Sequence, residues 1–499
     1  MLNILLKMSL YLGIDLGTSK IAVVLYNAEE NRIVYSSSHP HNSMRIKGRF
    51  YEIDPIKIRE KVIGILEGIP FKDEVKGIGI STQMHGTLIV DKKVNPITPL
   101  ITWEDKRCLD NYPYRSKNYI EVMEEIAGKR SFYNTGTFPA TGFMGSTLFW
   151  FSKNNPEVFK KGYKACFLGD YIVSYFTDRK IITDFTCAGS SGFFDIKNKR
   201  WLYEIIRKFS IPEEIFPEVK ETGDIAGNIN STVAGKTGFS KKCFILTSIG
   251  DNQASIIGSA GLLKDRSVLN IGTGSQISSK IKYFKRKKFL DTRYFIENTY
   301  ILVGAGLSGG KSVVILEKFL KEVGRKIFGF KIKSLYKKIK EIVSKHKISK
   351  DEMIFGNFFK GLRFFPEKKG FLAQISEENF SIENFIFSIF LGILLEMRYY
   401  WEKMGNKSEK EIIGSGNGFR KNPFGQMTSN LFKKTVKVSP FREEAGFGAA
   451  ILAAYKKEKN FDIDGRIGKI GRYKVYYPEK DSEIFDQIYS KFKDYFETF

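Results

Sequence analysis

The chain has 499 residues, of which 42% are hydrophobic and 27% charged, and its formal net charge is +25. This composition is typical of a globular protein and excludes a disordered or collagen-like chain. The length exceeds one ordinary core, so we expect two or more domains. The four cysteines are scattered without a C-x-x-C pair, which argues against a zinc site or disulfide framework and fits a reducing cytoplasm.

The high positive charge raises the question of nucleic-acid binding. The densest basic stretches, KYFKRKKF from residue 282 and KIKSLYKKIKEIVSKHKISK from residue 331, carry apolar residues at structural spacing. We interpret them as exposed hairpin and helix faces, and predict no nucleic-acid partner. Apolar runs at 1–9 and 386–397 are too short to span a bilayer, so we predict no membrane partner. Met8 is an alternative start, and a homodimer stays open.

Strand and helix patterns alternate along the chain, which predicts an α/β fold. Strands are expected in YLGIDLG, IAVVLYN, RIVYSSS and VKGIGIST, with helices over 55–68, 117–128 and 144–159. From residue 265, DRSVLNIGTGSQISSKI repeats the strand, turn and strand of the first hairpin. Two hairpins of one design, each opening half of the chain, predict two related domains that face a shared nucleotide.

The first turn, DLGTS from Asp15, allows two interpretations. It is either a plain hairpin turn or a site where backbone N–H groups hold a phosphate beside an Mg²⁺ on Asp15. A third glycine cluster, GSGNG at 414–418, ends an apolar strand and precedes a helix-like run. Small residues there let a flat ring approach the backbone, and a helix N-terminus favours phosphate. Three such clusters in this order favour a nucleotide site.

A family resemblance rests on segments that occur in one order: DLGT at 15, GISTQMHG at 79, ITWEDKRC at 101, IGDNQAS at 249, NIGTGSQ at 270, GSGNGFRKNP at 414 and EAGFGAAILAA at 444. In them the chain resembles the FGGY family of carbohydrate kinases, within the actin/hexokinase-like ATPase superfamily. The resemblance implies two actin-like (ribonuclease H-like) domains around a central ATP and sugar cleft. It implies a sugar-binding and catalytic domain over 10–258 and a nucleotide-binding domain over 262–456. Residues 1–9 are then an N-terminal extension and 457–499 a C-terminal packing tail, with an amphipathic helix at 477–496.

The resemblance also implies roles for two carboxylates. Asp251 takes the position of the catalytic base, and Asp15 lies on the Mg²⁺ and phosphate side, so both are candidate metal ligands. ATP is expected at the glycine-rich turns, namely Gly17, Thr18, Ser19, Gly272, Thr273, Gly274, Gly309, Gly310, Gly414, Gly416 and Asn417. The nearby Lys20 adds charge or points into solvent.

The sugar is expected between Met84 and His85 on one side and Trp103 and Asp105 on the other, with Asn252 beside the base. Core packing remains an alternative for Trp103, and a fork-like ion pair with Arg107 for Asp105. QMHG resembles the ketose kinases such as xylulokinases, whereas LITWEDKRC resembles sedoheptulokinases. The expected reaction is ATP-dependent phosphorylation of a ketose in the cytoplasm, giving sedoheptulose 7-phosphate, with xylulose or another FGGY substrate as the alternative.

Two competing hypotheses remain. AGLSGGKS at 305–312 approaches a P-loop but has Ala305 in place of the first glycine, and Lys311 where the family often has Asn. A sugar sensor without catalysis is the other. The segment TDFTCAGSSGFFDIKNKRW at 183–201 is interpreted as a structural β-turn framework, with Asp195 and Trp201 packing at its end.

Overall fold

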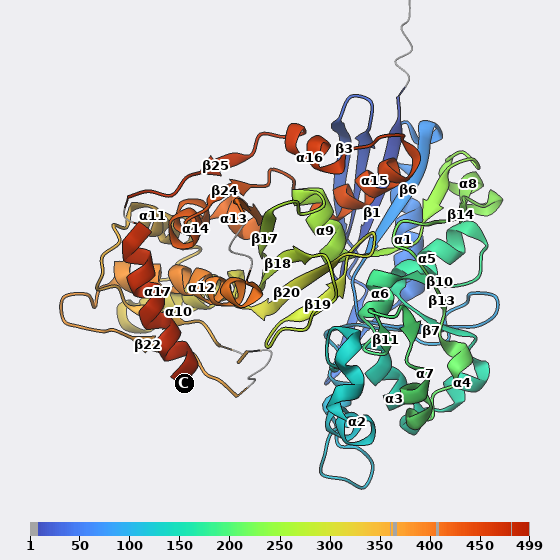
Figure 1. The fold of residues 1–499 in the computed structure, drawn as a ribbon, viewed down its shortest axis with the longest axis horizontal. Coiled ribbons are helices and arrows are strands. Elements are labelled where there is room, and N and C mark those ends of the chain that lie inside the picture. The colour runs from blue at the N-terminus through green and yellow to red at the C-terminus, as the bar shows by residue number, and fades with distance from the viewer. Residues whose placement is uncertain (1–7, 360, 363–366, 406–408, 481, 499) are drawn as a thin grey trace, which may run out of the picture.

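The structure, a computed structural model, describes residues 8–359, 361–362, 367–405, 409–480 and 482–498. Most of the start segment 1–9 therefore lies outside the described residues. The chain forms two lobes, each built on a large mixed sheet (Figure 1). No helix in the described ranges is both long and apolar enough to cross a membrane.

The first sheet opens with the predicted hairpin. β1 pairs antiparallel with β2 and parallel with β6, and β2 pairs antiparallel with β3. Its strands are β1 (Leu10–Leu16), β2 (Lys20–Asn27), β3 (Arg32–Pro40), β6 (Val75–Thr82), β14 (Ile225–Asn228), β15 (Phe244–Leu246) and β16 (Ile249–Gly250). The near-continuous apolar runs of β1, β2 and β6 are explained by burial on both faces.

The second sheet repeats this plan. β17 pairs antiparallel with β18 and parallel with β23, and β18 pairs antiparallel with β20. Its strands are β17 (Arg266–Ile271), β18 (Ser275–Ile281), β19 (Asp291–Tyr294), β20 (Tyr300–Leu307), β23 (Glu411–Ser415), β24 (Thr435–Val438) and β25 (Lys474–Tyr476). The predicted hairpin at KYFKRKKF is wrong, because β18 pairs with β20 and this segment only connects β18 to the edge strand β19.

Helices fill the space between and around the sheets. Those near the first sheet and its lobe are α1 (Pro55–Glu67), α2 (Tyr119–Ala127), α3 (Met144–Asn154), α4 (Glu157–Lys161), α5 (Leu168–Thr177), α6 (Phe185–Gly189), α7 (Tyr203–Ile206) and α8 (Ser231–Thr237). Around the second sheet lie α10 (Gly310–Phe328), α11 (Tyr336–Lys345), α12 (Ile382–Met404), α13 (Gly416–Lys421), α14 (Phe424–Phe432) and α17 (Ser482–Thr498). α16 (Ile463–Lys469) instead lies beside the turn between β2 and β3, where the carbonyl oxygen of Arg466 accepts from the side chain of Asn31. The helix predicted over 144–159 ends at Asn154, and Pro156 separates it from α4.

Short strand pairs complete the lobes: β4 (Met44–Lys47), β5 (Phe50–Ile53) and β8 (Leu100–Ile101); β7 (Leu88–Val90) with β9 (Lys164–Cys166); β10 (Ile182–Asp184) with β13 (Glu218–Lys220); β11 (Phe194–Asp195) with β12 (Arg200–Trp201); and β21 (Ile354–Gly356) with β22 (Phe371–Ala373). The apolar segment at 386–397 is part of the buried helix α12, as predicted. The amphipathic C-terminal helix is also confirmed, since α17 buries its apolar face in the core of the second lobe.

Two helices join the lobes. α9 (Asp251–Ala260) and α15 (Glu444–Lys457) pack on each other, and α15, coloured red in Figure 1, lies among the blue strands of the first sheet. A Cβ on Gly13 would lie 1.8 Å from the carbonyl oxygen of Gly446, and one on Gly258 would lie 2.0 Å from that of Glu444. Glycine at these positions lets backbone meet backbone. One apolar core accordingly contains residues of both sheets and both helices.

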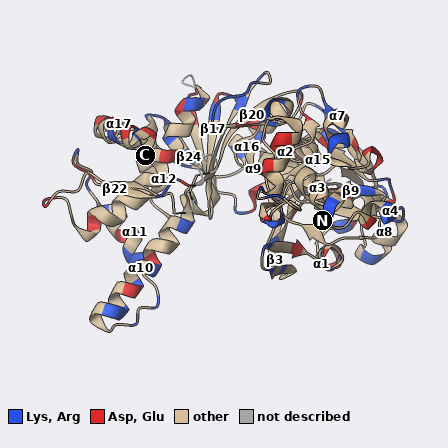
Figure 2. Cartoon of the chain, turned by 90° about the horizontal axis from the view of Figure 1, so that it is seen from below, with Lys and Arg blue, Asp and Glu red and all other residues tan. Residues whose placement is uncertain are grey.

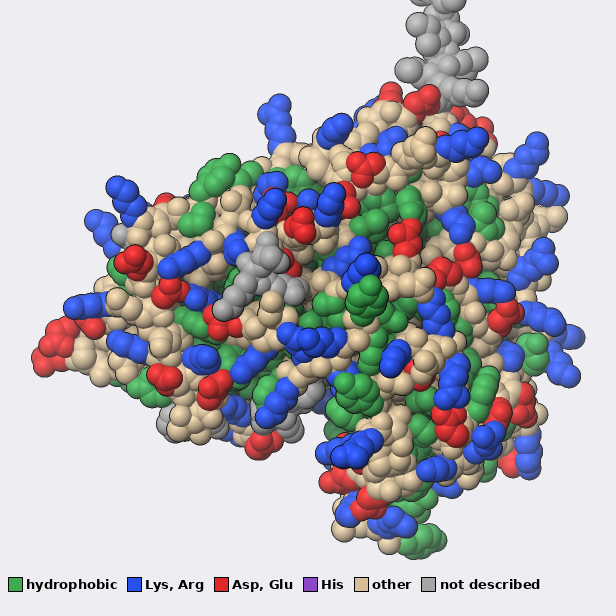
Figure 3. All heavy atoms as spheres, in the orientation of Figure 1, with side chains coloured by type: hydrophobic (Ala, Val, Ile, Leu, Met, Phe, Trp, Pro, Cys, Tyr) green, Lys and Arg blue, Asp and Glu red, His purple; other side chains and the backbone are tan. Residues whose placement is uncertain are grey.

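The charge is distributed over the whole molecule. Lys and Arg occur on both lobes in Figure 2, and on the face seen in Figure 3 they alternate with acidic side chains instead of forming one stripe. Many of the basic side chains form ion pairs on the surface, for example Lys326 with Glu322 on α10. These features give no support to a nucleic-acid groove on the face shown.

Candidate active site

A cleft of about 810 Å³ is lined by residues of both sheets and of the joining helices. Of the residues predicted from the sequence, it brings together Asp15, Met84, His85, Trp103, Asp251, Asn252 and Gly274. They come from segments up to more than 250 residues apart, which the fold brings to one cleft.

Asp15 stands near the end of β1, one residue before the turn. In the parallel register of β1 and β6 it lies beside Ser81, whose hydroxyl donates a hydrogen bond of 2.8 Å to its Oδ1. Burial raises the pKa of Asp15 to about 7, and the charge of Asp251 adds to this rise. A cation beside such a carboxylate stabilises its ionised form.

Asp251 is the first residue of α9, directly after β16. Its Oδ1 accepts the N–H of Asn252 at 2.7 Å. Burial raises the pKa of Asp251 to about 6, with the Asn252 N–H and the positive charge of Arg293 acting in the opposite direction. At neutral pH the group is mostly ionised and is still basic enough to accept a proton.

Met84 and His85 follow β6. The His85 backbone has a φ of 73°, in the left-handed region that a non-glycine residue seldom occupies. Its Nδ1 lies 2.9 Å from the carbonyl oxygen of Ser190, which only accepts, so Nδ1 carries a proton. The ring stacks on Phe143 at 4.1 Å between centroids. His85 is therefore held in one orientation at the edge of the cleft.

Trp103 is 49% exposed, which rules out the core-packing alternative. Its Nε1–H donates to the hydroxyl of Thr18 at 3.1 Å, and that hydroxyl lies 3.4 Å from Oε1 of Gln83. The indole thus lies against the DLGTS turn and leaves a ring exposed to the cleft.

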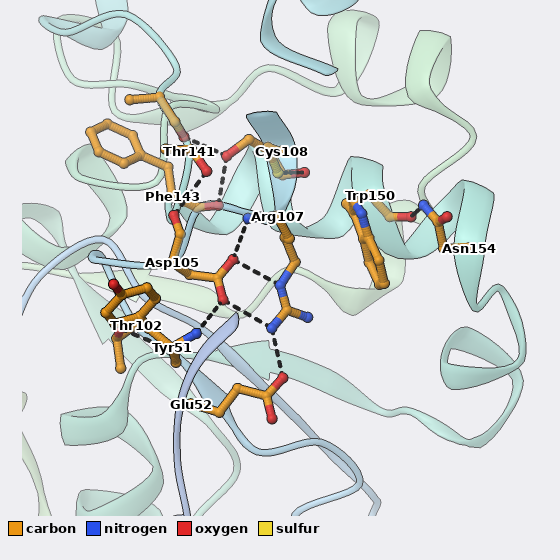
Figure 4. Close-up of polar contacts among 12 residues, drawn as sticks. Tyr51, Glu52, Thr102, Asp105, Arg107, Cys108, Thr141, Phe143, Trp150 and Asn154 are labelled. Atoms are coloured by element: carbon orange, nitrogen blue, oxygen red, sulfur yellow. Dashed lines mark hydrogen bonds and ion pairs between the residues drawn. The ribbon is translucent and has the colours of Figure 1, made fainter. Parts of the chain in front are cut away.

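Asp105 is the one sugar-site prediction that the geometry does not support. It is fully buried and does not line the cleft. Its Oδ1 accepts from Nε of Arg107 at 2.8 Å, and its Oδ2 accepts from Nη2 of Arg107 at 3.0 Å and from the Tyr51 N–H at 2.8 Å (Figure 4). The fork-like ion pair, the alternative interpretation, is the arrangement found.

This ion pair supports the cleft indirectly. Arg107 also donates to Glu52 at 2.6 Å, and its guanidinium lies over the rings of Phe50 and Trp150. The carbonyl oxygen of Asp105 accepts the hydroxyl of Thr141, a cleft residue, at 2.8 Å (Figure 4). The buried pair therefore fixes the loop that presents Trp103.

The glycine turns of the second lobe contact each other. The N–H groups of Gly310 and Lys311 donate to the carbonyl oxygens of Gly272 and Thr273 at 2.9 and 2.8 Å. The N–H groups of Gly17 and Gly272 close their own turns, onto Lys20 and Gly274. In this conformation these amides are not phosphate donors, which leaves that role to their neighbours in the two turns.

The remaining nucleotide candidates lie at the same end of the strands of the second sheet. Gly309 packs against Gly274, while Gly414 lies in β23 and Gly416 and Asn417 begin α13 directly after the cleft residue Ser415. The P-loop hypothesis is not supported, because the amides that would hold a phosphate are bonded to the turn at 272–273 and Lys311 is exposed away from the cleft lining. Lys20 forms an ion pair of 2.5 Å with Glu443.

Sequence reasoning missed Arg293, on the edge strand β19. It lines the cleft, donates from Nη1 to Oδ1 of Asn252 at 3.1 Å, and pairs with Asp291 at 3.1 Å. A guanidinium only donates, so it turns the Asn252 oxygen toward itself and the NH₂ group the other way. An arginine within a short strand carries no motif, and only the fold brings it to α9.

Comparison with known proteins agrees with this architecture. The models for the N-terminal and C-terminal domains of the FGGY family of carbohydrate kinases match residues 10–258 and 317–456. The chain belongs to the FGGY family of carbohydrate kinases. The FGGY resemblance of the sequence and the predicted two-domain α/β fold are thereby confirmed.

The relatives include kinases of different sugars. Xylulose kinase of Lactococcus lactis is 25% identical over 90% of this chain and 88% of its own length. Sedoheptulokinase of Mus musculus is 23% identical over 88% of this chain and 96% of its own length. Among solved structures, xylulose kinase from Rhodospirillum rubrum has a TM-score of 0.85 and 18% identity, and gluconate kinase from Lactobacillus acidophilus a TM-score of 0.84 and 19% identity, each with 98% of both chains covered.

Proposed function

We propose that this FGGY kinase transfers the terminal phosphoryl group of ATP to a hydroxyl of a ketose, and that the ketose is sedoheptulose. The observation that carries the proposal is the pair Asp15 and Asp251, two half-buried carboxylates on separate elements that line one cleft with His85 and Trp103. Phosphoryl transfer to a sugar needs a base for the attacking hydroxyl, groups that neutralise the phosphate charge and a surface that positions the sugar.

Asp251 is the general base in this proposal. The ketose hydroxyl gives its proton to Asp251 while its oxygen forms a bond to the γ-phosphorus, and the bond from that phosphorus to the bridging oxygen of ADP breaks. Asn252 and His85 bind sugar hydroxyls, and the exposed indole of Trp103 covers a C–H face. The second sheet supplies the turns at 272–274 and 414–417 for the nucleotide.

The residues present fit an Mg²⁺ ion. Mg²⁺ is held in proteins through one or two carboxylates together with waters and substrate phosphates, and it needs no larger cage. Asp15 meets this requirement, because it faces the cleft, is only partly exposed and has a pKa raised by desolvation. When bound, the ion neutralises phosphate charge. Asp15 holds it on the phosphate side, while Asp251 keeps its proton-accepting role.

The choice of sedoheptulose rests on the segment at 100–108 and on the mouse sedoheptulokinase among the relatives. Xylulose kinases are more numerous among those relatives, so D-xylulose is the alternative. Sedoheptulose has two more carbons, whose hydroxyls need partners. Thr141, Asn252 and Arg293 add polar groups to the cleft beyond the Met84–His85 pair. A site built for these hydroxyls disfavours the shorter sugar.

The test is ADP release across sedoheptulose, D-xylulose, D- and L-ribulose, L-fuculose, glycerol and gluconate. We expect kcat/KM for sedoheptulose to exceed that for D-xylulose by about tenfold, or ~1.4 kcal/mol of transition-state binding, with the phosphate on the terminal C7 hydroxyl. A preference for D-xylulose would overturn the assignment of sedoheptulose as the substrate and would leave the proposed sugar kinase activity intact. ATP turnover that needs no sugar and is lost in Lys311→Ala would support the P-loop hypothesis. Sugar binding without ATP turnover would support the hypothesis of a sugar sensor.

A further inference from the structure

The strand that leads to Asp251 is held by a segment that sequence analysis assigned to a structural framework. The Gly250 N–H, one residue before the base, donates to Oγ1 of Thr186 at 2.8 Å. Thr186 lies in the short helix α6 and is 1% exposed. The contact joins α6 to the point where β16 ends and α9 begins.

The Thr186 hydroxyl is itself oriented. It lies 2.7 and 2.9 Å from the two oxygens of Asp184, the N-cap residue of α6, and donates its single proton there. Its lone pairs are then left for the Gly250 N–H. Asp184 is fully buried and also accepts from the hydroxyl of Thr222 at 2.7 Å and from the Cys187 N–H at 2.8 Å. Neutral donors on several sides thus fix the carboxylate in place.

The other end of α6 holds His85, which follows the neighbouring strand β6. Ser190, the C-cap residue, accepts the His85 N–H on its Oγ at 3.0 Å and the His85 ring on its carbonyl oxygen at 2.9 Å. Its hydroxyl proton goes to the carbonyl oxygen of Cys187 at 2.7 Å. Since His85 has a left-handed backbone, this support keeps it in a conformation it would otherwise leave.

We propose that α6 positions two groups of the sugar site, with Thr186 as the positioning residue for Asp251 and Ser190 as that for His85. The proposal rests on the sugar kinase function above. A displacement of 1 Å at a reacting group costs up to about a hundredfold in rate. The two ends of α6 therefore have separate effects, one on the chemical step and one on sugar binding.

Thr186→Val tests the first end, with Thr222→Val as its matched control. Both substitutions remove a buried hydroxyl that donates to Asp184, but only Thr186 also accepts the Gly250 N–H. We expect Thr186→Val to lower kcat about tenfold or more, with KM for Mg²⁺–ATP unchanged. Thr186→Ser restores kcat, and Thr222→Val keeps it within about twofold while losing similar thermal stability.

Ser190→Ala tests the second end. It removes the acceptor of the His85 N–H and keeps the backbone carbonyl that holds the ring. We expect KM for the ketose to rise about fivefold with kcat near that of the parent, because one buried hydrogen bond is lost. In the double variant Thr186→Val with Ser190→Ala, we expect kcat/KM for the ketose to fall by the product of the two single fold-changes.

The outcomes separate the two proposals. A parent enzyme without ketose-dependent ADP release removes the proposed function. An active parent in which Thr186→Val and Thr222→Val lower kcat equally overturns the role of α6, as does a Ser190→Ala variant with unchanged KM for the ketose. If Thr186→Val does not fold, Thr186→Ala carries the same expectation and the same contradiction.

Discussion

The two sheets have the same plan and differ in charge at the matching position. Asp15 of β1 pairs in register with Ser81 of β6, and Asn270 of β17 pairs in the same way with Ser415 of β23. Ser81 donates to Asp15 at 2.8 Å, whereas the Asn270 amide donates to Ser415 at 2.6 Å. Asp15 and Asn270 both line the cleft. One sheet therefore presents a carboxylate and the other a neutral amide at the same structural site.

The joining helices differ in the same sense. α9 begins with Asp251, which lines the cleft, and α15 begins with Glu444, which does not. The Glu444 carboxylate is buried and paired with Arg420 at 2.9 Å. The first sheet and α9 thus carry the cleft carboxylates, whereas the cleft side chains of the second sheet are neutral except for the cationic Arg293. The carboxylates of the first half suit the binding of a cation and the acceptance of a proton. The lack of carboxylates among the described cleft residues of the second half suits the binding of polyanionic phosphates.

The largest expected effect comes from Asp251→Asn, which keeps the shape of the side chain and removes the base. We expect kcat to fall about a hundredfold or more, with sugar binding largely kept. The counterpart Glu444→Gln should lower thermal stability and leave kcat within about threefold, because Glu444 packs away from the cleft. Steady-state kinetics and thermal melts of both variants measure the contrast. Similar kcat values in the two would remove the functional difference between the helices.

Asp15→Asn gives the first sheet the amide of the second. We expect kcat/KM for Mg²⁺–ATP to fall about tenfold or more, ~1.4 kcal/mol, because the phosphate side loses its anionic ligand. The affinity for the ketose should change little. Separate titrations of sugar and Mg²⁺–ATP measure this, and a defect confined to the sugar would contradict the assignment of Asp15.

The pH profile tests the ionisation of Asp251. Burial raises the pKa of this acid to about 6, so the proton-accepting form is lost as pH falls through that value. We expect kcat/KM for the ketose to fall about tenfold per pH unit below it. A bound cation near Asp15 shifts this limb to lower pH, so the profile is measured at several Mg²⁺ concentrations. A flat profile between pH 7 and 5 would exclude Asp251 as the base.

Local patterns predict many of the elements, and the family resemblance predicts much of the cleft. Apolar runs that end in Gly-Thr turns indicate β1 and β17, whereas the resemblance of QMHG to the ketose kinases indicates Met84 and His85. Asp105 was misplaced because a motif does not say which way a side chain points. Its carboxylate is turned inward, where Arg107 and the Tyr51 N–H satisfy it.

Other site residues had no local signal at all. Arg293 reaches Asn252 only because the connection after β18 places β19 at the outer edge of the sheet. Thr186 contacts Gly250 across a gap of 64 residues, from a segment that had been predicted as turns but contains α6. Contacts of this kind depend on how elements dock, which a single sequence does not state.

The smallest expected effect comes from the reverse exchange, Asn270→Asp, which places a carboxylate at the matching position of the second sheet. Asn270 donates to Ser415, whose hydroxyl can turn to donate to a carboxylate instead, so the fold should tolerate the change. The added charge would face the phosphates of the nucleotide. We expect KM for Mg²⁺–ATP to rise about fivefold, or ~1 kcal/mol, with little change for the ketose, and the effect should shrink with added salt. An unchanged KM at low salt would show that the neutral amide of the second sheet has no bearing on nucleotide binding, and the contrast between the sheets would then concern the first sheet alone.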